Sequence, residues 1–141
     1  MTSTTIKKTV FFAASREVVW SFLTEKDKLA QWFHAPERDL EEGQEYTLAR
    51  KNEQGVFIPQ IWGKVLTMDA PNKLVYTFII DPFGDAETTV TWMLEDAASG
   101  TRLTLIHEGI AEATGPMAMS LLTALDNGWD KHFDDLRKAT Q

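Results

Sequence analysis

The chain has 141 residues, of which 43% are hydrophobic and 25% charged, and its 14 basic and 21 acidic side chains give a formal net charge of −7. This length and apolar content indicate one globular domain over residues 1–141 and argue against extensive disorder. The acidic balance argues against nucleic-acid binding, which needs a basic surface. The absence of cysteine excludes disulfides, thiolate nucleophiles and cysteine zinc sites.

A strand pattern and two helical patterns follow one another in the N-terminal part. Ile6 to Phe12 is a short apolar run typical of a β-strand. Ser15 is a favourable N-cap for a first helix. Thr24 is the expected cap of a second short helix, with Leu29 and Trp32-Phe33 as its apolar face.

The middle of the chain indicates strands separated by turns. Strand patterns occupy 45–50 and 56–68, and apolar and polar residues alternate at 74–80, 90–94 and 103–107, between clusters of Asn, Asp, Gly and Pro. Consecutive strands with short turns favour an antiparallel sheet. Gly63, inside the longest run, predicts a bend, a bulge or the close approach of another group.

From Pro116 to Arg137 the apolar period changes to steps of three and four residues, which predicts one amphipathic helix of ~33 Å. The stripe consists of Ala118, Leu122, Leu125, Trp129, Phe133 and Leu136. The order of elements predicts an α+β fold in which this helix lies on one face of an antiparallel sheet of about six to seven strands. The preceding segment 108–115 contains two glycines and is a candidate lid loop.

No apolar run approaches the ~18 residues of a membrane-spanning helix. The first ten residues lack the apolar centre of a signal peptide. We therefore expect a cytoplasmic protein without membrane insertion. Nothing in the sequence decides between a monomer and a homodimer, although an exposed strand edge would allow pairing.

Seven short strings stand out along the chain, namely Ala14–Trp20, Leu29–Phe33, Trp62–Val65, Ala70–Phe78, Val90–Trp92, Gly100–Leu105 and Gly128–Trp129. In order and spacing they resemble the family of activator of heat-shock-protein-90 ATPase homologues within the START-like (SRPBCC, birch-pollen-allergen-like) superfamily. One departure is His34-Ala35-Pro36, where the family often has Gly-Pro after an aromatic pair.

This resemblance implies a helix-grip fold, in which a curved sheet wraps around the long C-terminal helix and two short helices close one end. Such folds leave an apolar cavity between sheet and helix. Members of the superfamily bind lipids, sterols or polyketides, and some are chaperone cofactors. The superfamily has no common catalytic motif to carry over to this chain.

The facing strands and terminal helix carry many aromatic side chains, which either line a cavity or fill a solid core. Trp62 is ambiguous because its strand has apolar residues at both parities. The candidate cavity-lining residues are Phe57, Ile61, Trp62, Phe78, Trp92, Leu105, His107, Met119, Leu122, Trp129 and Phe133.

His107 shares strand parity with Leu103 and Leu105, so it is either a hydrogen-bonded core histidine or a polar group in the cavity. His132 adjoins the stripe residue Phe133 and is a candidate to flank the same groove. The histidines lack the spacing of metal ligands, and no phosphate-binding loop is present, so we expect neither a metal nor a cofactor.

Three functions remain as hypotheses. The first is non-enzymatic binding of a small apolar molecule in the cavity, favoured by the aromatic excess and the resemblance. The second is a protein-interaction module with a chaperone partner, although this chain lacks the additional domain of the eukaryotic activators. The third is a cyclase- or hydrolase-like enzyme with His107 as acid or base.

Overall fold

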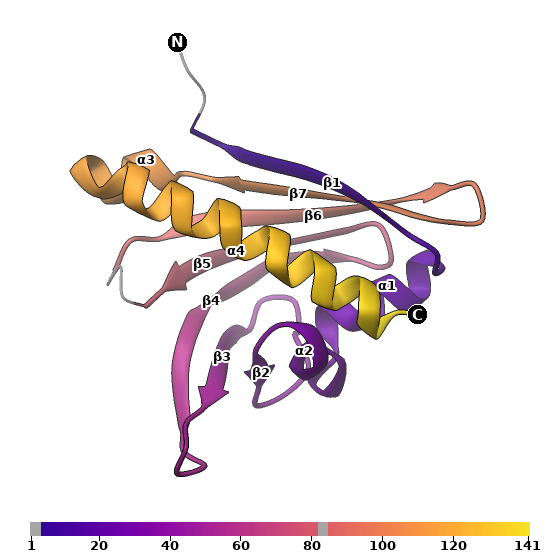
Figure 1. The fold of residues 1–141 in the computed structure, drawn as a ribbon, viewed down its shortest axis with the longest axis horizontal. Helices are drawn as coiled ribbons and strands as arrows, with labels where there is room; N and C mark the ends of the chain where they lie inside the picture. Colours follow the sequence, from indigo (N-terminus) through magenta and orange to yellow (C-terminus); the bar gives the residue numbers. More distant parts are fainter. Residues whose placement is uncertain (1–3, 82–84) are drawn as a thin grey trace.

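The computed structural model describes residues 4–81 and 85–141, so the first three residues of the expected domain and positions 82–84 lie outside the description. Within these residues, seven antiparallel strands form one sheet in the order β1-β7-β6-β5-β4-β3-β2 (Figure 1). The expected α+β helix-grip architecture is confirmed. The strands are β1 Ile6–Phe12, β2 Ala35–Pro36, β3 Glu45–Lys51, β4 Phe57–Asp69, β5 Lys73–Ile80, β6 Thr88–Ala97 and β7 Gly100–Glu108.

Helix α4 (Ala118–Ala139) crosses one face of the sheet, and the short helices α1 (Arg16–Thr24) and α2 (Lys26–Trp32) lie near its C-terminal half (Figure 1). Lys8 of β1 ties the sheet edge to this helix, since its Nζ lies 3.0 Å and 2.8 Å from the Oδ1 atoms of Asp126 and Asp130. None of the helices within the two described ranges is long and apolar enough to cross a membrane.

The buried stripe of α4 consists of Leu121, Leu125, Trp129, Phe133 and Leu136. The predicted stripe is therefore confirmed from Leu125 onward. One turn earlier the prediction is off by one residue, because Leu121 is buried and Leu122 only half-buried. Steps of four residues back from Trp129 lead to position 121, so Leu122 lies to the side of the stripe.

The caps of α1 and α2 have different origins. The Ser15 hydroxyl accepts a hydrogen bond from the backbone N–H three residues later at 3.3 Å, as predicted. The prediction for Thr24 is wrong, because its hydroxyl donates to a carbonyl inside α1. A carboxylate oxygen of Asp39 instead accepts from the backbone N–H of Lys26 at 2.7 Å. This cap comes from a segment beyond β2, which a local pattern does not reveal.

The segment expected to be a lid loop contains a helix. Residues Ile110–Thr114 form α3, and Gly115–Met117 form a short 3₁₀ turn that leads into α4. Gly109 precedes α3 in the left-handed conformation, with a φ of 83°, which a glycine adopts without strain. The Ile110 side chain is fully buried, so this segment is anchored to the core.

Gly63 of β4 marks a close approach, which was one of its predicted roles. A β-carbon at this position would lie 2.2 Å from the backbone oxygen of Thr77 on β5. The Thr77 carbonyl accepts a hydrogen bond from the Tyr46 hydroxyl at 2.6 Å. The Thr77 hydroxyl accepts a hydrogen bond from the Lys64 backbone N–H at 2.8 Å. Thr77 therefore replaces part of the regular β4–β5 ladder at this point.

We expect Gly63→Ala to lower the free energy of unfolding by about 1–3 kcal/mol or more, because the added methyl group meets backbone atoms that cannot move aside. Urea unfolding followed by tryptophan fluorescence measures this change. Gly128→Ala in α4 is the matched control, since a β-carbon there meets nothing within 4 Å. The control should gain stability, by up to about 1 kcal/mol, from the higher helix propensity of alanine. A Gly63→Ala protein as stable as the wild type would contradict the close approach.

Candidate functional site

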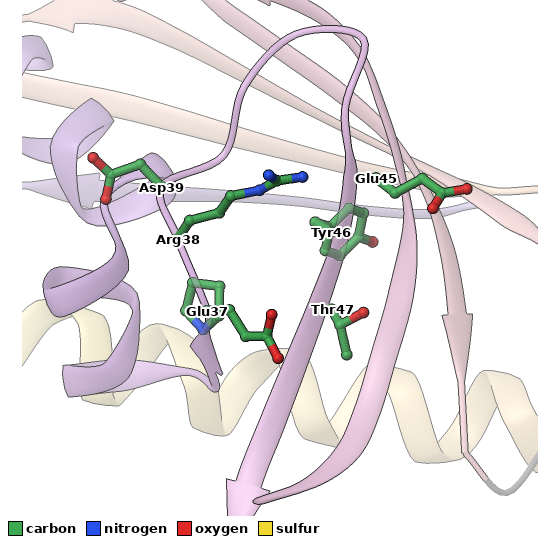
Figure 2. Close-up of a pocket in the computed structure, with 7 residues that line it drawn as sticks. Glu37, Arg38, Asp39, Glu45, Tyr46 and Thr47 are labelled. Atoms are coloured by element: carbon green, nitrogen blue, oxygen red, sulfur yellow. The ribbon is translucent and has the colours of Figure 1, made fainter.

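Two surface hollows lie around β2 and β3. One, of about 410 Å³, has mainly polar walls. Figure 2 shows Arg38 reaching from the segment after β2 towards β3, whereas the Glu45 carboxylate points away from this hollow. The other, of about 470 Å³, runs along α2, β2 and β3 and includes the exposed Phe57. Most residues that line these hollows are exposed, so a small ligand there would stay largely in water.

A third hollow, of about 180 Å³, lies between α4 and the sheet. Helix α4 contributes positions 121, 124, 125, 128, 129 and 132, which share one helical face. Strands β4 and β5 contribute Ile61, Phe78 and Ile80, and the connector after α2 contributes Phe33 and His34. This hollow lies between sheet and helix, where the resemblance implies an apolar cavity, and we call it the α4 cavity.

Two small residues keep space open on the helix side of the α4 cavity. Gly128 and Ala124 lie one turn apart and both line it. A β-carbon at Gly128 would meet no atom within 4 Å, and its φ is not in the left-handed region, so neither packing nor backbone geometry requires glycine there. Glycine in a helix interior costs about 1 kcal/mol relative to alanine. What this glycine provides is empty volume beside the cavity.

The polar part of the α4 cavity consists of His34, His132 and Asp81. The rings of the two histidines are 5.6 Å apart between centroids and meet edge to face. Burial lowers the pKa of His34 to about 4, with further lowering from the nearby charges of His132 and Arg50. Burial also lowers the pKa of His132. Both imidazoles are therefore neutral at neutral pH. No group of three side chains that could hold a metal ion occurs within the described residues.

His107 lies behind the α4 cavity and is fully buried. The Trp129 indole N–H donates to its Nδ1 at 3.2 Å. Its Nε2 lies 2.7 Å from the Thr88 hydroxyl oxygen, and that hydroxyl donates to the Phe78 carbonyl at 2.8 Å, so Nε2 must be the donor to Thr88. Burial lowers the pKa of His107 to about 3. Its two ring nitrogens are thus both engaged by protein groups in one neutral tautomer.

The aromatic side chains of α4 and the sheet pack solidly beside the cavity. The rings of Trp92 and Trp129 lie 5.4 Å apart and nearly perpendicular, and Trp92 contacts Phe133 in the same way at 6.0 Å. Phe78 lies 5.9 Å from Trp129. Edge-to-face contacts of this kind stabilise cores by about 0.5–1.5 kcal/mol per pair. The space under α4 is therefore solid around Trp92 and open towards its N-terminal half.

The structure divides the predicted cavity residues into three groups. Ile61, Phe78 and Trp129 line the α4 cavity. Trp92, Leu105, His107 and Phe133 are buried in the core beside it. The remaining four lie elsewhere: Trp62 and Leu122 are half-buried outside its wall, Phe57 lies in the hollow beside α2, and Met119 is 68% exposed.

Sequence reasoning left several lining residues out of its candidate set. Phe33 was expected on the apolar face of the second short helix but not in the cavity wall, and His34 follows it on a short connector, where no periodicity marks a buried face. Ile80 ends its strand, and Leu121 was displaced by the one-residue error in the stripe. Gly128 carried a usable signal, since a glycine in the middle of a strong helical pattern needs a reason.

A family model described as Activator of Hsp90 ATPase homolog 1-like protein matches residues 13–141. The chain belongs to this family. The resemblance noted from the short strings is thereby confirmed. No curated protein matches the chain.

Solved structures place this protein among helix-grip folds. CalU16 from Micromonospora echinospora is 25% identical, with a TM-score of 0.76 over 97% of this chain and 76% of CalU16. The Aha1 dimer from Colwellia psychrerythraea is 20% identical, with a TM-score of 0.73 over 96% and 95% of the two chains. DynU16, from the dynemicin biosynthetic locus, is 20% identical with a TM-score of 0.79 over 97% of this chain and 47% of DynU16. The chain thus spans about half the length of DynU16.

The buried histidine makes stability depend on pH. An unfolded His107, with a pKa near 6.5, takes up a proton below that pH, whereas the folded side chain stays neutral down to about pH 3. The contribution of the neutral His107 to the free energy of unfolding is therefore fully present above about pH 6.5. Below that pH the free energy of unfolding falls by about 1 kcal/mol per pH unit for each such histidine. We expect His107→Gln to be less stable at pH 7 but to show a shallower fall between pH 7 and pH 5. Urea unfolding at several pH values checks this, and equal slopes for the two proteins would contradict it.

Proposed function

We propose that this protein binds a small apolar molecule in the α4 cavity. The observation that carries the proposal is a hollow of about 180 Å³ beneath α4, nine of whose twelve lining residues are apolar. Such a volume is several times the ~30 Å³ share of one water molecule and similar to the ~150 Å³ cavity that holds benzene in an engineered protein. A ligand with one or two rings fits this size.

The lining supports binding without a catalytic step. The cavity has the features of small-molecule sites, namely concave apolar walls with a few polar groups at one place. Burying apolar area contributes about 25 cal/mol per Å². A two-ring hydrocarbon would therefore bind with a dissociation constant on the order of 10–100 µM after the losses of association. The occurrence of DynU16 in a biosynthetic locus fits a role close to small-molecule chemistry.

A chaperone-directed interaction is the second candidate, because the family description names an ATPase activator. The acidic net charge of −7 would complement a basic surface on such a partner. The Colwellia relative is described as a dimer, so self-association is an additional arrangement for this fold. An effect of the purified protein on the ATPase rate of a chaperone from the same cell would favour this candidate.

An enzymatic role through His107 has weaker support. A general acid or base needs a ring nitrogen within reach of a substrate proton. Both nitrogens of His107 are engaged by Trp129 and Thr88. We therefore favour binding over acid–base chemistry at this residue. Unchanged turnover of a discovered substrate by His107→Gln would remove this role altogether.

The test of binding uses Gly128, where a larger side chain would enter the cavity. We expect wild-type protein to bind naphthalene in calorimetric titrations and Gly128→Leu to bind at least tenfold more weakly, because the leucine side chain occupies the space that the ring needs. Gly128→Leu should unfold no more easily than the wild type, since leucine favours the helix. Asn127→Leu, at the exposed neighbouring position, is the matched control and should bind as the wild type does.

Native mass spectrometry of freshly purified protein adds an independent readout. An excess mass that is present in wild type and in Asn127→Leu, but absent in Gly128→Leu, would identify the natural ligand of the cavity. Equal naphthalene affinity in wild type and Gly128→Leu would contradict binding at this cavity. A lack of naphthalene binding in every variant would contradict the proposed function itself.

A further inference from the structure

The polar end of the α4 cavity has an unusual composition of hydrogen-bonding groups. Its polar lining residues are His34, His132 and the carboxylate of Asp81, and among the described residues that form the wall there is no Lys or Arg. Asp81 is exposed, so this end meets solvent. The polar groups therefore offer acceptors and one anion to a bound molecule, while the basic side chains whose charges act on the two histidines, Arg50 and Lys131, lie outside the lining.

The tautomer of His132 is determined by the backbone. Its Nδ1 lies 3.3 Å from the carbonyl oxygen of Trp32, and because a carbonyl only accepts, Nδ1 carries the hydrogen. In a neutral imidazole the other nitrogen, Nε2, is then an acceptor. The ring is held in place by neighbouring aromatic side chains, with centroid distances of 4.6 Å to Phe33 and 6.1 Å to Trp129. His132, which lines the cavity, thus has one acceptor nitrogen of defined identity.

Among the described residues, no protein group uses this acceptor. In the part of the chain that the structure describes, no hydrogen bond reaches Nε2 of His132 or either ring nitrogen of His34, whereas the ring nitrogens of His107 are both engaged. A bound molecule that covers this end of the cavity removes water from Nε2 and must supply a donor, or the acceptor is left unpaired. Leaving a buried polar group without a partner costs about 1–3 kcal/mol.

We propose that the ligand is a neutral hydroxylated ring compound of the phenol class, which places its ring among the apolar residues and donates its hydroxyl hydrogen to Nε2 of His132. This inference rests on the proposed function of the α4 cavity. A hydrocarbon would leave Nε2 unpaired, and a carboxylate would bring a second anion beside Asp81 while having no hydrogen to donate to Nε2. A neutral hydroxyl satisfies the acceptor without either cost.

Three probes of matched shape test this inference by calorimetry at neutral pH: naphthalene, 2-naphthol and 2-naphthoate. For wild type we expect 2-naphthol to bind about fivefold to tenfold more tightly than naphthalene, in line with one net hydrogen bond. We expect 2-naphthoate to bind more weakly than either. His132→Phe keeps the aromatic packing but has no acceptor, so the preference for 2-naphthol over naphthalene should fall to less than twofold.

His34→Phe is the matched control, because it replaces the other histidine at the same end of the cavity and should keep the preference for 2-naphthol. A second measurement needs no variant: the unprotonated ring nitrogen of His132 should shift in nitrogen NMR spectra on addition of 2-naphthol, but much less with naphthalene. This signal keeps the test decisive if His132→Phe does not fold.

The outcomes separate the two proposals. Suppose that naphthalene binds to the wild type and that Gly128→Leu blocks this binding. If the wild type then binds 2-naphthol no more tightly than naphthalene, or binds 2-naphthoate most tightly, the cavity function stands and the hydroxyl inference is overturned. If the preference persists in His132→Phe and is lost in His34→Phe, the assignment to His132 is overturned. If none of the probes binds, the proposed function fails and the inference fails with it.

Discussion

A chain of buried hydrogen bonds holds α4 against the sheet, and the shape of the α4 cavity depends on it. The indole of Trp129 donates to His107, His107 donates to Thr88, and Thr88 donates to the carbonyl of Phe78. These residues belong to α4, β7, β6 and β5 in turn. Each donor in the chain is satisfied inside the protein, so a rotation of α4 would leave an indole N–H and an imidazole unpaired, at a cost of about 1–3 kcal/mol each.

The orientation of α4 about its own axis then determines which of its residues face the sheet. With Trp129 directed at His107, Leu125 and Leu121 follow on the same stripe, and Gly128, Ala124 and His132 lie along its flank. The large rings fill the space around Trp92, whereas the small residues leave a void nearer the helix N-terminus. The packed core and the cavity therefore both follow from the one orientation of α4 relative to the sheet. The same side chains that make the core rigid also give the cavity a defined wall.

Much of the fold followed from local patterns, because period and turn chemistry act over a few residues. The alternation in the strands, the stripe from Leu125 onward and the cap at Ser15 are of this kind. Features that depend on contacts distant in the sequence were missed, such as the cap that Asp39 provides for α2. The side of the sheet on which Trp62 lies also needed the pairing of β4 with its neighbours, since both parities of that strand are apolar.

The candidate site was harder to predict than the fold for the same reason. Aromatic composition indicated that rings gather between sheet and helix, but not where the packing ends. That boundary is determined by the size of Gly128 and by the course of the connector that carries Phe33 and His34, and neither has a periodic signature. The role of His107 likewise depended on Thr88 and Trp129, which come from other elements.

The position of β1 has a consequence for how the chain folds. Its partner in the sheet is β7, with Ile6 opposite His107, so the two strands are separated by roughly 100 residues of sequence. Closing so long a segment costs entropy before any contact rewards it, and topologies of this kind fold slowly. During synthesis β1 emerges before the other strands, yet its partner β7 is the last of the described strands to be made. Until then the apolar face of β1, with Ile6 and Phe12, has no native surface to cover it.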